Sequence, residues 1–185
     1  MRSGHLINNE PIIKLGHRLL CSLFAAYDFE DFYREPDPKL RDPDPLDDFR
    51  QFEDNEMSEN LLTLAALARA CDDESNQLAN AGRSFPNGVG TLTTLKKVIS
   101  LTLREACNKV IHANSVRYEL ARRPENPIWG KWYKDQGHAV SKDFKVPAII
   151  LHGTQQNGES WEARIEMVPF VIGVSLWNIA QWKIA

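Results

Sequence analysis

The sequence predicts a mainly α protein of the α+β class, a helical bundle with a C-terminal β-hairpin and a last apolar helix. Apolar residues recur at helical spacing through the first two-thirds of the chain, and β-branched, alternating stretches follow. With 185 residues and 43% hydrophobic content, the chain suits one globular domain with a substantial core. We therefore expect a single domain over 1–185, with the bundle in 11–120 and an acidic loop in 34–57. Residues 121–185 should hold an aromatic-rich connection, the hairpin and the terminal helix.

The first expected helix runs from Pro11 to Tyr33. Proline suits the first helical turn, because its missing N–H would have no partner there. A run of prolines between 36 and 45 ends the helix. The apolar stretch around Leu20 has the length of a signal-peptide core, but its helical spacing and the lack of a small-residue cleavage site favour a helix. The residues at this spacing are Ile12, Leu19, Leu20, Leu23, Phe24 and Tyr27.

The region 28–59 is strongly acidic and holds about half of the chain's Asp and Glu residues. Four of its aspartates, Asp42, Asp44, Asp47 and Asp48, offer oxygen atoms that a metal ion could use. The Asp-x-Asp-x-Asp-Gly order of a calcium loop is absent, however, and prolines intervene. A solvated acidic face or a docking surface for a partner is the favoured interpretation.

Two further helices complete the expected bundle, over 58–80 and 91–120. Ser58 suits the N-cap of the first, since its hydroxyl can accept a hydrogen bond from a free backbone N–H. Leucines and alanines between 61 and 70 make this helix apolar on nearly all sides, so we expect it to be central. The glycine-rich loop between the two helices lacks the Gly-Lys-Ser/Thr of a phosphate-binding loop and is interpreted as a tight turn with a Thr cap.

The last third of the chain changes character. Residues 121–143 look irregular, and their aromatic side chains either pin the segment to the helices, which we favour, or stack on bases. The stretches 146–151 and 161–167 flank a Gln-Gln-Asn-Gly turn and predict a β-hairpin, because apolar and charged residues alternate in the second. The apolar stretch 170–182 predicts a last helix, with a third strand over 170–175 as the alternative. The aromatic residues of the irregular segment are Trp129, Trp132 and Tyr133.

Charge and composition exclude several classes of function. The net charge is -3 and the pI is near 6.0, so the chain has no overall basic footprint for coating nucleic acid. The three cysteines, Cys21, Cys71 and Cys107, lie far apart, as is typical of free thiols buried in a reducing compartment. No apolar run approaches the roughly 20 residues that span a bilayer. We therefore expect a cytoplasmic protein without membrane association.

Residues that could carry chemistry gather in one place. No His-Glu-x-x-His and no Gly-x-Ser-x-Gly motif is present, so we expect no metal and no cofactor. Arg104, Asn108 and His112 follow one another at four-residue steps and would form a stripe along a helix. Histidine can move protons near neutral pH, and arginine can stabilise charge on a phosphate. The stripe also resembles an ordinary wet helix face, because Glu105 and Lys109 flank it as an i, i+4 ion pair.

The stretch CNKVIHA over 107–113 resembles the signature helix of HEPN-domain proteins. These are small helical bundles, common in bacterial toxin–antitoxin and anti-phage systems, and many are metal-independent RNases. The resemblance implies a homodimer in which two motif helices form one composite cleft. The implied site residues are His112 as general acid or base, Arg104 as phosphate clamp and Asn108 for positioning, with Lys109 and Arg117 as RNA- or phosphate-binding residues.

The first functional expectation is therefore a HEPN-like, metal-independent RNase of a bacterial defence or toxin system, acting on single-stranded or looped RNA. Its partners would be a second copy of the chain, RNA, and a protein such as an antitoxin or a defence-complex subunit. The alternative is a non-catalytic interaction or scaffold module that binds a protein partner through its acidic surface or dimer face. Cys107 motivates this alternative, because the family has Arg directly before the Asn. A third option is a small-molecule sensor with a pocket near Trp129 and Trp161.

Overall fold

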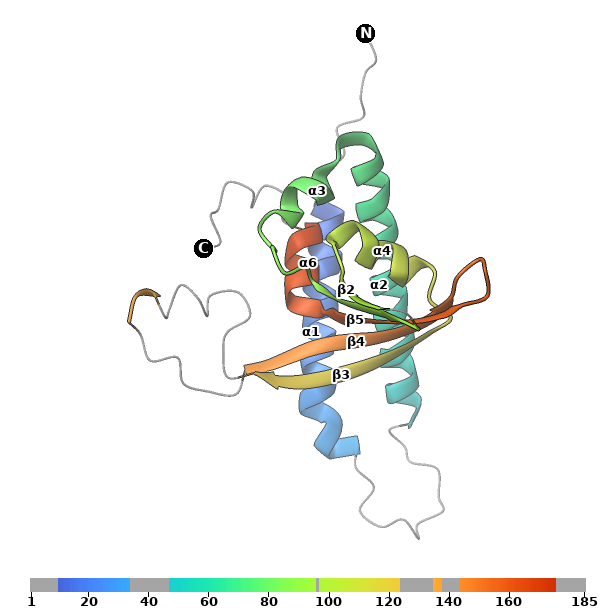
Figure 1. The fold of residues 1–185 in the computed structure, drawn as a ribbon. Helices are drawn as coiled ribbons and strands as arrows, with labels where there is room; N and C mark the ends of the chain where they lie inside the picture. Colours follow the sequence, from blue (N-terminus) through green and yellow to red (C-terminus); the bar gives the residue numbers. More distant parts are fainter. Residues whose placement is uncertain (1–9, 34–46, 96, 124–134, 138–143, 176–185) are drawn as a thin grey trace.

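The protein is an α+β domain in which helices cover one face of a five-stranded antiparallel sheet (Figure 1). The computed structural model describes residues 10–33, 47–95, 97–123, 135–137 and 144–175. The strand order in the sheet is β2-β1-β5-β4-β3. The helices are α1 (Glu10–Tyr33), α2 (Asp47–Ser75), α3 (Gln77–Gly82), α4 (Leu103–Ile111) and α6 (Met167–Ser175), and the strands are β1 (Gly90–Thr94), β2 (Val98–Ser100), β3 (Ser115–Arg123), β4 (Phe144–Thr154) and β5 (Ser160–Glu166).

The predicted C-terminal hairpin is confirmed as β4 and β5. Ile149 pairs with Ile165 and Leu151 pairs with Ala163, so the alternating apolar residues share one face. Gly158 supplies the positive φ of 84° that the turn between the strands requires. The hairpin is stable because it lies inside a larger sheet, with β3 on one side and β1 on the other.

The sheet and the helices share one hydrophobic core. Trp161, Ala163 and Ile165 of β5 are buried in it, together with Ile149 and Leu151 of β4. The helices contribute the remaining large buried side chains to the same cluster. Those that are less than 2% exposed, or close to it, include Ile12, Leu19, Leu23, Leu64, Leu103, Met167 and Phe170.

The helical bundle expected over 11–120 is wrong, because 91–120 does not fold as one helix. This stretch forms most of β1, all of β2 and α4, and the first part of β3. Leu92 pairs with Ile99 across the β1–β2 hairpin, although their spacing also suited a helix. Leu92 pairs on its other side with Ala163 of β5, a contact between distant parts of the chain. The spacing of apolar residues cannot reveal such a contact, and the contact overrides the local preference for a helix.

The acidic loop expected over 34–57 is also wrong in part. α2 begins at Asp47, two residues after Pro45, so 47–57 is helical. Aspartates suit a first helical turn because they face the positive end of the helix dipole. Ser58, expected as an N-cap, lies inside α2, and its hydroxyl hydrogen-bonds the Tyr118 hydroxyl at 3.0 Å. Residues 34–46 lie outside the described ranges.

The first and last helices agree better with the prediction from the sequence. α1 confirms the predicted first helix, with a start one residue earlier. α6 shows that the apolar stretch near the end is helical, so the strand alternative over 170–175 is wrong. The helix starts three residues before the predicted position, directly after β5. Residues 176–182 and the three aromatic residues Trp129, Trp132 and Tyr133 are outside the described part of the chain.

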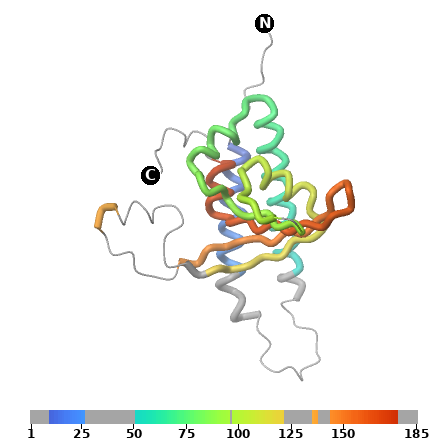
Figure 2. The backbone as a smooth tube through the Cα atoms, in the orientation of Figure 1, coloured from blue at the N-terminus to red at the C-terminus, as the bar shows by residue number. Residues whose placement is uncertain are grey.

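α1 and α2 run across the strand direction, and α2 continues past β3, the strand at one edge of the sheet (Figures 1 and 2). The hydrogen bond between Ser58 and Tyr118 marks the point where α2 meets β3. Residues 51–57 of α2 precede this point and correspond to about 10 Å of helix at 1.5 Å per residue. The helical layer therefore extends further than the sheet on the β3 side.

Candidate functional site

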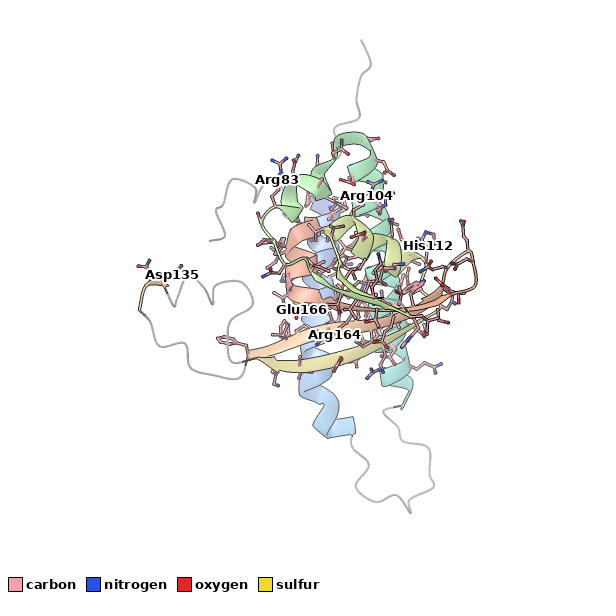
Figure 3. The ribbon with its side chains drawn as sticks, in the orientation of Figure 1. Arg83, Arg104, His112, Asp135, Arg164 and Glu166 are labelled. Atoms are coloured by element: carbon pink, nitrogen blue, oxygen red, sulfur yellow. The ribbon has the colours of Figure 1, made fainter. Side chains whose placement is uncertain are left out.

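α4 carries most of the residues singled out in the sequence. Thr102 caps it: the Thr102 hydroxyl accepts from the Glu105 backbone N–H at 3.2 Å, and the Glu105 carboxylate accepts from the Thr102 backbone N–H at 3.1 Å. The expected stripe therefore starts at Arg104, the second residue of a nine-residue helix. Arg104 lies near its first end, and His112 forms the C-cap at the other end (Figure 3).

Arg104 binds two carboxylates of α2. Its guanidinium hydrogen-bonds the Asp72 carboxylate, and its second terminal nitrogen lies 2.6 Å from Asp73 Oδ1. Asp72 is 1% exposed and also accepts from the Leu78 backbone N–H at 2.7 Å. The hydrogen bond from Arg104 lowers the pKa of the Asp73 carboxyl below its ordinary value. Two carboxylates thus neutralise the guanidinium, and Arg104 joins α4 to α2.

Cys107 is fully buried in the core. Burial raises the pKa of its thiol to about 12, so it stays protonated at neutral pH. The HEPN resemblance noted in the sequence would expect Arg at this position, and a guanidinium there would have to enter the core instead of a cleft.

Lys109 packs against the sheet. Its ammonium nitrogen lies 4.2 Å from the centre of the Trp161 ring, within the range of a cation–π contact. Burial lowers the pKa of Lys109. The Glu105 carboxylate bonds Thr102, so the expected Glu105–Lys109 pairing is replaced by a cap and a ring contact.

The remaining predicted site residues lie on different elements. Asn108 is half-buried on α4, and His112 is exposed at its end. Arg117 is exposed on β3, and within the described residues it has no ion-pair partner. The structure therefore keeps Arg104, Asn108 and His112 on or next to one short helix, and it separates Arg117 from them.

A pocket of about 210 Å³ lies beside the end of α4. It is walled by α2, by the turn from α4 into β3, and by one residue of β4, and most of its side chains are apolar. In the sequence, His112 lies between Ile111 and Ala113, which both line the pocket. Leu62, on the rim of the pocket, is 48% exposed. The lining residues are Ser58, Leu61, Leu62, Val110, Ile111, Ala113, Asn114, Ser115, Val116 and Leu151.

The first part of α2 gives this pocket an acidic border. Its described residues 51–59 hold four acidic residues and no basic residue. Burial raises the pKa of the Tyr118 phenol, and the Asp54 carboxylate adds to this effect, so Asp54 is near enough to act on it. Tyr118 in turn bonds Ser58 on the pocket wall. An apolar recess and an acidic helix segment therefore adjoin at the β3 edge.

Sequence reasoning missed this pocket because it placed its walls on two long helices. The missed signal is the alternation of Val116, Tyr118 and Leu120 with polar neighbours, which is the period-two pattern of a strand. In the aromatic region proposed for a ligand sensor, Trp161 is 4% exposed, and Lys109 packs on its ring.

The described parts of the chain hold no group of three His, Cys, Asp or Glu side chains that could bind a metal ion. Within the same parts, no helix has the length and apolarity needed to cross a membrane. Comparison with known proteins adds no assignment, since no protein-family model, curated protein or solved structure matches the chain. The site must therefore be interpreted from its own chemistry.

Proposed function

We propose that this protein is a non-catalytic interaction module that binds a protein partner at the pocket beside β3. One observation carries the proposal: an apolar recess, with Leu62 exposed on its rim, adjoins the acidic first part of α2. The recess is smaller than the roughly 300–1,000 Å³ typical of small-molecule sites. Its size and lining suit an apolar side chain of a protein partner.

The charge around the pocket favours a protein over RNA. RNA carries a dense negative charge, which the acidic segment 51–59 of α2 would repel. Arg104, the expected phosphate clamp, is already held by Asp72 and Asp73. A partner segment with basic residues would instead be attracted, and its binding would weaken with added salt.

A random 12-residue peptide library displayed on phage tests the proposal. The full chain serves as the target, and the recovered peptides are measured against Leu62→Glu and Leu67→Glu variants. Leu67 is the matched control, because it is also an exposed leucine of α2 but does not line the pocket.

We expect recovered peptides to bind the wild type and Leu67→Glu equally. The Leu62→Glu substitution should lower the affinity for these peptides by about tenfold or more, as when an anchor residue of an interface is lost. Failure to recover any peptide that distinguishes the two variants would overturn the proposed function.

A further inference from the structure

We infer that the partner binds as an extended segment that adds a sixth strand to the outer edge of β3. This inference rests on the proposed function and specifies its partner. The pocket opens at the first residues of β3, Ser115 and Val116, so a segment lying along this strand would pass directly over it.

The hydrogen-bond pattern of the sheet shows which groups of β3 are available. The Glu166 N–H donates to the Val89 carbonyl, so the even-numbered residues of β5 bond towards β1. In an antiparallel ladder the direction alternates at every residue. The odd-numbered residues of β5 therefore bond β4, the even-numbered residues of β4 bond β3, and the odd-numbered residues of β3 bond β4.

The even-numbered residues of β3 must then point their N–H and C=O groups away from the sheet. These residues are Val116, Tyr118, Leu120 and Arg122, and no other described backbone group pairs with the first three. The position of Pro147 agrees with this pattern. Its nitrogen, which carries no hydrogen, points towards β5 just beyond the last β4–β5 pair, Ala148 with Glu166, so no ladder bond is lost.

Among the described residues, the edge of β3 is open and regular. Its nine residues pair with β4 in an unbroken register, and the strand contains no proline. Within the described ranges, β3 has one strand neighbour, β4. Natural edge strands that must not pair are shortened, bulged, charged or interrupted by proline. β3 carries charged residues such as Arg117 and Glu119. Its length, its regular register and its lack of proline are features of a strand that accepts another chain.

The part of α2 that extends beyond β3 favours a single added segment over a second copy of the protein. An added strand would lie about 4.8 Å beyond β3, on top of this part of α2. Two copies whose β3 edges paired as antiparallel strands would carry their helices on the same side of the joint sheet. The two α2 extensions, each about 10 Å long, would then occupy the same space.

Neighbouring side chains specify the chemistry of the added strand. The residue opposite Val116 faces the apolar pocket, and the residue opposite Tyr118 lies on the same face towards Asp54. The residue between them faces the other side, next to Arg117, which lacks an ion-pair partner within the described residues. We therefore expect an apolar, an acidic and a basic residue in consecutive positions, in either chain direction.

Amide hydrogen exchange on the full chain, with and without a recovered peptide, tests the inference. In the free protein we expect slow exchange at Arg117 and Glu119 and fast exchange at Val116, Tyr118 and Leu120. Peptide binding should slow the three fast amides by about tenfold or more and leave the other two unchanged. Peptides that require Leu62 but leave the three amides unprotected would overturn strand addition while the proposed function stands.

A pair of substitutions at Leu120 provides a second measurement. Leu120→Pro removes an N–H that points away from β4, whereas Leu120→Ala shortens the side chain and keeps the N–H. We expect the proline variant to keep its fold by circular dichroism and to bind the peptide at least about fivefold more weakly than the alanine variant. Equal affinities would count against the inference.

Two further outcomes would also overturn it. If the three amides are protected in the free monomer, another segment of this chain occupies the edge. If they become protected as protein concentration rises, and sedimentation shows a dimer, the occupant is a second copy. Failure to recover any Leu62-dependent peptide would overturn the proposed function and the strand addition together.

Discussion

At the scale of single residues, Arg104 shows how neighbours decide the role of a side chain. In the sequence it is a cation four residues before an asparagine and eight before a histidine. In the folded protein Asp72 and Asp73 bind it, and Arg69 adds a second cation 3.0 Å from Asp73. These four residues, Arg69, Asp72, Asp73 and Arg104, form a joint that holds α4 against α2, and their two positive and two negative charges balance.

This joint predicts a pH-dependent contribution to stability. The pKa of Asp73 is lower in the folded protein than in the unfolded chain, because Arg104 hydrogen-bonds its charged form. The unfolded state therefore binds more protons in acid, and the stabilisation is present above the unfolded pKa of about 3.9 and lost as the pH falls through the folded value. In urea unfolding, the wild type should have a larger free energy of unfolding than Asp73→Asn at pH 6. This difference should become smaller as the pH falls towards 2.

Glu74→Gln provides the control for this prediction. Glu74 is the next residue of α2, and in the described structure it has no ion pair. The difference between wild type and this variant should stay small across the same pH range. A gap for Asp73→Asn that does not change with pH would contradict the role of the joint.

Cys107 marks the limit of residue-level prediction. The sequence identifies it as the residue that stands where the HEPN resemblance expects Arg, and as a free thiol in an apolar context. The structure confirms its burial. The exposure of the neighbouring motif residues Asn108 and His112 could not be foreseen, because it depends on which face of α4 packs against α2 and the rest of the core.

At the scale of elements, strong local patterns predicted structure and ambiguous ones did not. The period-two alternation of Trp161, Ala163 and Ile165 predicted β5, and the helical spacing of residues in α1 predicted that helix. Leu92, Leu95 and Ile99 fit a helix equally well, yet they belong to a strand hairpin. Leu92 pairs with Ala163, which lies far along the chain, so the energy that selects the strand is non-local.

The tight β4–β5 contact predicts a large effect of one methyl group. A Cβ at Gly153 would overlap the Trp161 ring, which packs over this glycine. Gly153→Ala should therefore lower the free energy of unfolding by about 1–3 kcal/mol, since the ring cannot move without disturbing the core. Gly82→Ala is the matched control, because nothing lies within 4 Å of a Cβ there and Ala suits a helix better. Equal unfolding midpoints in urea for the two variants would contradict this packing.

At the scale of the whole molecule, the five-stranded sheet is the main difference between the observed fold and the predicted helical bundle. Residues in the first half of the chain form helices as expected, but the sheet collects β1 and β2 with strands from the last third. The candidate site arises where these distant parts meet, since Ser58, Val110, Val116 and Leu151 line the same pocket. Sequence reasoning found the acidic region near it, and it missed the pocket because no local pattern joins those residues.

RNA cleavage stays a prediction that can be tested directly. Wild type, His112→Ala and His152→Ala can be incubated with looped and single-stranded RNA in EDTA, and products followed on denaturing gels. His152 is the control, because it is also an exposed histidine and lies near Glu162 on the sheet. We expect no cleavage by any of the three, since Asp72 and Asp73 hold Arg104.

The opposite result would be equally clear. Cleavage by wild type and His152→Ala, with a loss of about a hundredfold or more in His112→Ala, would establish His112 as a general acid or base. It would also contradict a purely non-catalytic interaction module.

The central place of β5 has a consequence for the order in which the domain can be completed on the ribosome. β1 pairs with β5, which is synthesised about 70 residues later, and α6 follows directly after it. At roughly 5–20 residues per second, the first hairpin waits several seconds for its neighbour. Throughout that interval the apolar side of Leu92 has no β5 strand beside it, so the nascent chain depends on shielding until nearly the whole domain has emerged.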